Sequence, residues 1–149
     1  MKRAKKNDKQ RDKTTHSKPI KSSDTLKPIW MFDMIDKGGR FTFDVLRDDF
    51  NHKEVLDKMI HYSTMTCADI KQQTNDKGKS KHHFIGCDSI SKDAIDRIHA
   101  KKLDEFSDMI FSFAFQNKLR IIGIRSNQCF HVLWYDPNHE VCPSSKKHT

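Results

Sequence analysis

The stretch FSFAFQNKLRIIGIRSNQCFHVLWYDPNHEVC, residues 111–142, decides the fold because it holds the densest apolar and aromatic residues of the chain. Within it, residues 119–125 and 129–135 each distribute their side chains over two faces, which is the period-two pattern of β-strands. An apolar segment at residues 110–115 precedes them after a short connection. Together the three segments predict a three-stranded antiparallel meander at the C-terminal end of a sheet.

The register of the hairpin depends on the length of its turn. A three-residue turn at 126–128 places Ile124 opposite Phe130, whereas a two-residue turn places Ile124 opposite His131. Matching of apolar side chains across the strands favours the three-residue turn. On that register His131 lies opposite Gly123, where no side chain blocks a ligand.

Shorter elements are expected ahead of the meander. Residues 30–34, 41–45 and 82–85 have the composition of short strands, and the glycine-containing segment 36–40 is typical of a turn. Helical periodicity and capping residues predict three helices. These begin at Asp48 or Asp49 and end near Tyr62, run from Thr66 to about Gln73, and run from Lys92 to Leu103 behind Ser89 or Ser91. The fold class expected is α+β, with a curved antiparallel sheet and two or three helices packed on one face.

Positive charge is concentrated at the N-terminus. The chain of 149 residues has a formal net charge of +8, and residues 1–27 contribute seven of these charges from ten Lys or Arg against three Asp. This segment has no aromatic residue, so we expect a disordered basic tail, which either contacts phosphate groups or only aids solubility. Residues 28–149 are nearly neutral and are long enough to form a single α+β domain.

Several protein classes are disfavoured. The four cysteines include no CxxC pair, which is typical of reduced thiols in a cytosolic protein. There is no secretory signal and no run of about 18 apolar residues that would span a membrane. Glycine motifs for nucleotide binding and the nucleophile elbow of hydrolases are missing, and the His and Cys residues lack zinc-site spacing. We therefore expect a cytoplasmic protein without metal or cofactor.

Two groups of residues are candidates for chemistry. On the favoured register Arg125, His131 and Tyr135 share one face of the hairpin, and His139 follows the last strand. A histidine with an arginine and a tyrosine nearby suits RNA cleavage, which needs a base, a cation and an acid. The alternative is that these three are an ordinary sheet histidine, a surface charge and a core tyrosine.

The second group is His82-His83, preceded by three lysines at positions 77, 79 and 81. In a strand the two imidazoles point to opposite faces, so one of them at most serves a given site. His83 is a catalytic candidate, and Lys77, Lys79 and Lys81 are candidates for binding nucleic acid. A basic loop without function is the alternative.

The C-terminal third, LRIIGIR–SNQ–CFHVLWYDPNHEVCPS, resembles an uncharacterised bacterial family whose members end in a similar strand followed by Asp-Pro-x-His. The resemblance extends back over residues 65–70 and the His82-His83 strand, to about 30–144. The family implies no activity.

The hairpin also resembles, more loosely, the sheet of RelE/HigB-type toxins, which cut ribosome-bound mRNA. This resemblance implies phosphate contact by Arg120 or Arg125, and acid–base chemistry by His131, Tyr135 or His139. It further implies RNA or ribosome-bound mRNA and a cognate antitoxin as partners. The near-neutral charge of residues 28–149 departs from the strongly basic toxins. A non-catalytic module that binds nucleic acid or protein, such as a regulator or antitoxin-like partner, is therefore the alternative to a metal-independent ribonuclease.

Overall fold

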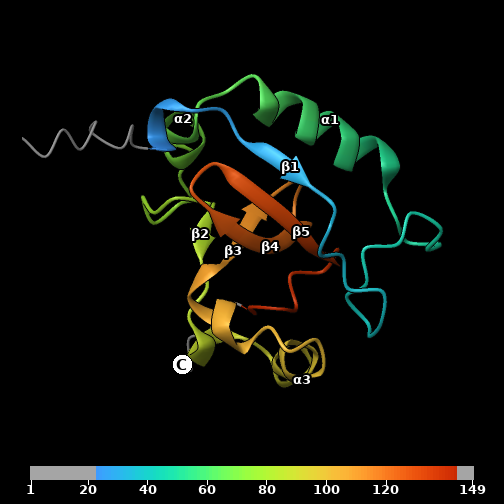
Figure 1. Ribbon diagram of the computed structural model, residues 1–149. Coiled ribbons are helices and arrows are strands. Elements are labelled where there is room, and N and C mark those ends of the chain that lie inside the picture. Colours follow the sequence, from blue (N-terminus) through green and yellow to red (C-terminus); the bar gives the residue numbers. More distant parts are fainter. Residues whose placement is uncertain (1–22, 144–149) are drawn as a thin grey trace, which may run out of the picture.

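A five-stranded mixed sheet organises the computed structural model, which describes residues 23–143 (Figure 1). The strand order is β1-β5-β4-β3-β2. The strands are β1 (Ile29–Met31), β2 (His83–Phe84), β3 (Ile110–Ala114), β4 (Arg120–Ser126) and β5 (Cys129–Asp136). β3, β4 and β5 form the antiparallel meander predicted from the sequence, whereas β1 pairs with β5 in parallel. The α+β class is confirmed, but the sheet is not purely antiparallel.

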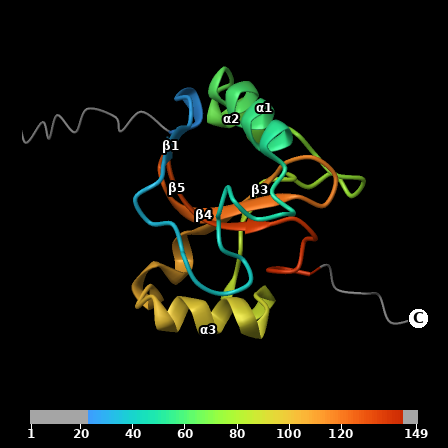
Figure 2. The same cartoon turned by 90° about the vertical axis from the view of Figure 1, so that its right-hand side faces the viewer.

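Helices lie on both faces of the sheet. They are α1 (His52–Ser63), α2 (Cys67–Lys71) and α3 (Lys92–Ala100), together with the 3₁₀ segments η1 (Ser23–Thr25), η2 (Cys87–Ser89) and η3 (Asp104–Met109). Figure 2 shows α1 and α2 on one side of the sheet and α3 on the other. The expectation of helices on one face is wrong in this detail. The physical reason for helices on both faces is that all five residues of β3 are buried, so other elements must pack on each face of the sheet.

Two apolar cores result from this arrangement. The core under α1 includes Val55, Met59, Phe113, Ile121, Phe130, Val132 and Tyr135. The core under α3 includes Ala94, Ile98, Ile110, Ile122, Leu133 and Trp134. Because the central strands supply side chains to both cores, α1 and α3 pack on opposite faces of the same meander.

The β4–β5 hairpin closes with a two-residue turn. Ser126 pairs with Cys129, Arg125 with Phe130, and Ile124 therefore lies opposite His131. Asn127 adopts a φ of 54°, which replaces the glycine usual in such turns. The prediction of a three-residue turn is wrong, because apolar residues on both faces make apolar matching a poor guide to register.

A β-bulge changes the faces of β5. Gly123 pairs with Val132 but Ile122 pairs with Trp134, so Leu133 is the extra residue. A Cβ on Gly123 would lie 2.1 Å from the carbonyl oxygen of His131. The glycine therefore admits the backbone of the neighbouring strand, and not a ligand as expected from the sequence. After the bulge, side chains that simple alternation would place on one face lie on the other.

The segment before α1 differs from the expectation of a second strand. Residues 41–45 form no strand: Thr42 makes an isolated bridge with Trp134, and the Tyr135 N–H donates to the carbonyl of Phe41 at 2.9 Å. The cap of α1 is Asn51, whose side chain accepts from the backbone N–H of Glu54 at 3.1 Å. Asp48 and Asp49 were the expected caps, but Asp49 is paired with Arg47 at 2.8 Å.

The other helix starts agree with the sequence. Thr66 and Asp69 form the expected capping box of α2, and the Ser91 side chain accepts from the Ala94 N–H at the start of α3. Both helices end earlier than predicted, α2 at Lys71 and α3 at Ala100. No helix in the described range is long and apolar enough to cross a membrane.

The last five residues of the segment that was expected to be disordered, 1–27, are structured. Residues 23–27 belong to the folded part, since η1 forms there and Cys67 N–H donates to the carbonyl of Leu26 at 2.8 Å. Residues 1–22 of the predicted tail lie outside the described residues.

A buried carboxylate joins three parts of the chain. Asp36 is fully buried and accepts two hydrogen bonds from Arg97, at 2.9 and 2.7 Å, one from the indole N–H of Trp134 at 3.0 Å and one from the Gly38 N–H at 3.0 Å. Burial raises the pKa of Asp36, but these donors outweigh it and the net shift is downward. The segment after β1 is thereby tied to α3 and β5.

Candidate functional site

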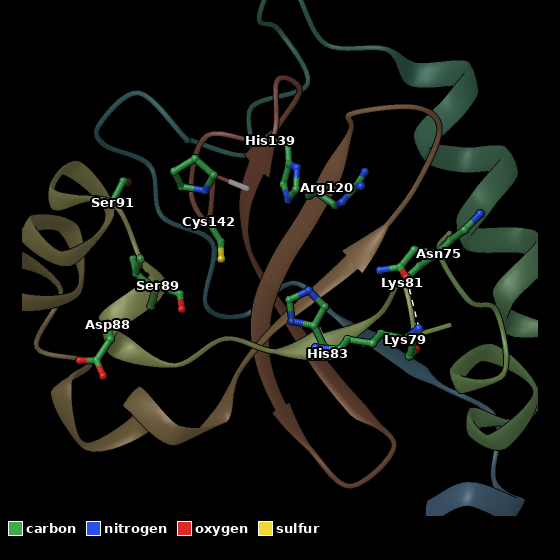
Figure 3. Close-up of a pocket in the computed structure, with 13 residues that line it drawn as sticks. Asn75, Lys79, Lys81, His83, Asp88, Ser89, Ser91, Arg120, His139 and Cys142 are labelled. Carbon is green, nitrogen blue, oxygen red and sulfur yellow. Dashed lines mark hydrogen bonds between the residues drawn. The ribbon is translucent and has the colours of Figure 1, made fainter. Parts of the chain in front are cut away.

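A cleft of about 800 Å³ lies between β2, the start of β4 and the turn after β5 (Figure 3). Five of its lining residues carry basic or imidazole side chains, and we call it the basic cleft: Lys79, Lys81, His83, Arg120 and His139. Asp88, Ser89 and Ser91 line another side. In Figure 3 His139 and Arg120 lie next to each other and His83 lies across from them.

His83 enters the cleft from the edge strand β2. Its Nδ1 lies 3.1 Å from the carbonyl oxygen of Phe84. Because a carbonyl only accepts, Nδ1 carries the hydrogen in this contact, and Nε2 has a lone pair when the ring is neutral. The exposed His83 ring can therefore accept a proton at Nε2, or donate one there when it is protonated.

His139 is presented by a tight turn at the end of β5. The buried Asp136 carboxylate accepts from the backbone N–H groups of Glu140 and Val141, both at 2.9 Å, and His139 has a φ of 57°. Burial lowers the pKa of His139, and the nearby Arg120 and His83 lower it further while Asp136 opposes them. The half-buried ring is thus mostly neutral at pH 7, the state that a general base needs.

Arg120 is the first residue of β4 and lies opposite Asp136. Its guanidinium donates to the carbonyl oxygens of Asn117 and Leu119, at 2.7 and 3.0 Å, which fixes its direction. Burial lowers the pKa of Arg120 and Asp136 raises it, yet an arginine in a protein keeps its proton. The cleft therefore holds a permanent cation beside His139.

The lysines come from a hydrogen-bonded turn. The Asn75 side chain accepts from the N–H groups of Lys77 and Lys79, at 2.9 and 3.2 Å, and the Lys81 N–H donates to the carbonyl of Gln73 at 2.8 Å. Residues 75–81 thus form a hydrogen-bonded turn. Lys79 and Lys81 line the cleft, whereas Lys77 does not.

The predicted hairpin group does not form. His131 lies on the β5 face toward α3 and its Nδ1 is 2.6 Å from an Asp33 carboxylate oxygen, a bond that lowers the pKa of Asp33. Tyr135 lies in the core under α1, because the bulge exchanges the faces. The prediction that the two share a face is wrong.

Arg125 and Tyr135 share the α1 side but sit at opposite ends of the hairpin. The Arg125 guanidinium lies 4.6 Å from the Phe111 ring centre. The Tyr135 hydroxyl donates to the carbonyl of Asp49 at 2.7 Å and accepts from the Asn51 N–H at 3.0 Å. Tyr135 therefore anchors the start of α1 and reaches none of the cleft residues.

His82 points away from the cleft, as alternation in a strand requires. Its Nε2 lies 2.9 Å from the Gln73 side-chain oxygen and its Nδ1 accepts from the Ala114 N–H at 3.1 Å. Burial, and then Arg120 and Lys81, lower the pKa of His82 to about 4. His82 is a structural histidine, and His83 alone of the pair faces the cleft.

Two residues of the site have no sequence pattern that indicates this role. The Asp136 carboxylate shapes the turn that carries His139, and Ser91, which the sequence predicts only as a helix cap, also lines the cleft. Within the described part of the chain no three His, Cys, Asp or Glu side chains gather as metal ligands.

Comparison with known proteins identifies a family. Residues 40–149 match the model of a family described as Uncharacterised protein UU032, and the chain therefore belongs to that family. The expectation of an uncharacterised family is confirmed, although the match begins later than residue 30. No curated protein and no solved structure matches the chain. The resemblance to RelE/HigB-type toxins stays a prediction.

Proposed function

We propose that this member of a family without an assigned activity is a small toxin-like ribonuclease, which binds single-stranded RNA in the basic cleft and cleaves it without a metal ion. The observation that carries the proposal is that His83 and His139, which are 56 positions apart in the sequence, line one cleft together with Arg120. Two imidazoles and a fixed cation are the groups that an RNA phosphodiester needs for transfer to its own 2′-hydroxyl.

Each group has a distinct role in this reaction. His139, whose pKa is lowered by burial and by Arg120, takes the proton of the 2′-hydroxyl. The 2′-oxygen then attacks phosphorus, and the bond to the 5′-oxygen breaks. Protonated His83 gives its Nε2 proton to the departing 5′-oxygen, while Arg120 stabilises the charge on the phosphorane. The products are a 2′,3′-cyclic phosphate and a free 5′-hydroxyl.

Lys79 and Lys81 supply the binding charge. Both belong to the ordered turn at residues 75–81, so their backbone positions are fixed before RNA binds. Phosphate contacts of this kind release counterions and make affinity depend on salt. A local basic surface is thus available although residues 28–149 are nearly neutral as a whole.

A non-catalytic binding module is the second candidate. It is favoured by the His139 ring, which makes no hydrogen bond with another described residue. In many acid–base sites a third group orients the histidine. Lys79, Lys81 and Arg120 would bind RNA even if neither histidine transferred a proton.

The deciding experiment incubates the purified protein with end-labelled RNA and with DNA of the same sequence in the presence of a chelator. We expect RNA fragments that end in 2′,3′-cyclic phosphate, and DNA that is bound but intact because it has no 2′-hydroxyl. His139→Ala, His83→Ala and Arg120→Ala should each lower the cleavage rate by about 100-fold or more. His61→Ala is the matched control, since His61 is exposed on α1 and does not line the cleft.

The outcomes separate the two candidates. Binding that depends on Lys79 and Lys81, without any cleavage, would exclude the ribonuclease and support the non-catalytic binding module. Cleavage that survives in all three variants would point to a contaminating nuclease. Expression in bacteria tests the toxin role: induced wild-type protein should arrest growth and the His139→Ala variant should not.

A further inference from the structure

A second cavity, of about 380 Å³, adjoins the basic cleft. Ser80 and His83 line both cavities, so one leads to the other across the edge strand β2. Five of its twelve lining residues carry aromatic or imidazole rings, and we call it the aromatic pocket: His82, His83, Phe84, Phe111 and Phe113. The charged residues Asp24, Lys71 and Arg125 also line it. It shares His83 with the catalytic group, and it contains none of the binding lysines described above.

Phe84 is unusually placed for a large apolar residue. It is 53% exposed on a strand at the edge of the sheet, where polar or charged side chains are usual. Its ring packs edge-on against Phe111, with ring centres 5.0 Å apart and planes at 79°. The ring therefore packs against Phe111 on one side while about half of the residue faces solvent.

A cation lies over the same rings. The Arg125 guanidinium carbon is 4.6 Å from the centre of Phe111 and 5.8 Å from the centre of Phe84. The Arg125 Nε also donates to the carbonyl of Asn127 at 2.8 Å, which holds the side chain in place. Fixed aromatic rings with a guanidinium beside them form the stacking surface that nucleic-acid bases favour.

We propose that the aromatic pocket binds one unpaired base of the RNA whose phosphates lie in the basic cleft, with Phe84 as the stacking surface. The inference rests on the proposed function, since it assigns a base subsite to the same RNA. A base in a duplex is already stacked on its neighbours, so only a single-stranded nucleotide can place its base in the pocket while its phosphate reaches Lys79 and Lys81. The aromatic pocket thus makes the protein selective for single strands.

The test measures affinity by fluorescence anisotropy, with a labelled single-stranded RNA of about ten nucleotides, its duplex, and the same strand carrying abasic positions. We expect Phe84→Ala to weaken single-strand binding by about 5- to 150-fold, the range for loss of one stacked base. Removing bases from the RNA should weaken wild-type binding to a similar degree and should have little further effect on Phe84→Ala. Phe84→Leu keeps an apolar side chain without a ring and should behave like Phe84→Ala.

Controls separate this subsite from the cleft. Leu56→Ala removes another exposed apolar side chain, 60% exposed on α1, and should leave affinity unchanged. Phe84→Ala should keep the wild-type dependence of affinity on salt, whereas Lys79→Gln and Lys81→Gln should reduce that dependence. Equal affinity of wild type, Phe84→Ala and Phe84→Leu for the single strand, with the lysine variants weakened, would overturn the base subsite and leave the proposed function standing. A wild-type protein that binds no RNA would overturn both.

Discussion

His82 and His83 are neighbours in the chain but lie in opposite surroundings. His83 faces the basic cleft, whereas His82 is 3% exposed and has both ring nitrogens in hydrogen bonds. The Ala114 N–H donates to Nδ1 of His82, so this nitrogen must be unprotonated for the contact to exist. Protonation of His82 at Nδ1 therefore breaks its hydrogen bond with Ala114 of β3.

The first prediction is that acid destabilises the fold through His82. Burial lowers its pKa from 6.5 to about 4 in the folded state, so between these values the unfolded chain binds the proton more readily. The free energy of unfolding should therefore fall as the pH drops from about 6.5 to about 4, by up to about 3 kcal/mol. Urea denaturation across this range measures the effect. His82→Gln should remove this pH dependence, and a wild-type curve that is flat over the range would contradict the assignment.

The second prediction concerns Asp36, the buried partner of Arg97. Asp36→Asn removes the charge but keeps the size, and leaves the guanidinium without its counterion. We expect a loss of about 2–3 kcal/mol in the free energy of unfolding, because an amide in place of the fully buried carboxylate cannot accept from all of the N–H donors of Arg97, Trp134 and Gly38. The control is Asp93→Asn, which breaks a pair between Asp93 and Arg40 that is exposed on both sides and should cost less than about 1 kcal/mol. Equal losses in the two variants would show that the buried network does not stabilise the fold.

At the scale of the elements, the bulge between β4 and β5 explains why the hairpin group of candidates failed. The strand lengths and the pairing of the meander follow from residue alternation. The bulge cannot be predicted from alternation, because both faces of these strands are apolar and a shift of one residue exchanges one buried side chain for another. His131 and Tyr135 were therefore predicted on one face, and the structure places them on two.

The third prediction tests the bulge directly. A methyl group at Gly123 would lie 2.1 Å from the carbonyl oxygen of His131, which is backbone and cannot turn aside. Gly123→Ala should lower the free energy of unfolding by about 2 kcal/mol or more. Gly86→Ala is the matched control, because nothing lies within 4 Å of its new methyl group. Thermal unfolding of both variants measures the difference. If Gly123→Ala leaves the free energy of unfolding unchanged, the strands pair without this close approach.

The basic cleft also depends on how elements meet. The sequence offers candidates in two separate parts of the chain. One part contains Lys79, Lys81 and His83, the other contains Arg120 and His139, and no sequence pattern indicates that the two parts meet. They converge because β2 pairs with β3 at the edge of the sheet, with only β3 and β4 between β2 and β5. Residue types and local elements were thus predictable, whereas the contact between distant segments was not.

At the scale of the whole molecule, charge is distributed in three parts. The body of residues 28–149 is nearly neutral, the basic cleft gathers cations on one side of it, and residues 1–22 contain nine Lys or Arg against two Asp. The described chain begins at Ser23, and Ser23 lines the aromatic pocket. A strand of RNA that fills the basic cleft and the aromatic pocket would therefore come close to where the basic segment joins the fold.

The last prediction follows from the position of Ser23 at the aromatic pocket. Deleting residues 1–22 should weaken binding of single-stranded RNA and reduce the slope of log affinity against log salt concentration, by about 0.7 for each phosphate contact that the segment makes. The free energy of unfolding should stay unchanged, since the contacts between η1 and α2 are kept. Combining the deletion with Lys79→Gln separates the two sources of charge, because distant contacts should reduce the slope additively. A deletion variant with the affinity and slope of the full chain would show that the segment does not touch RNA, and would confine phosphate binding to the cleft.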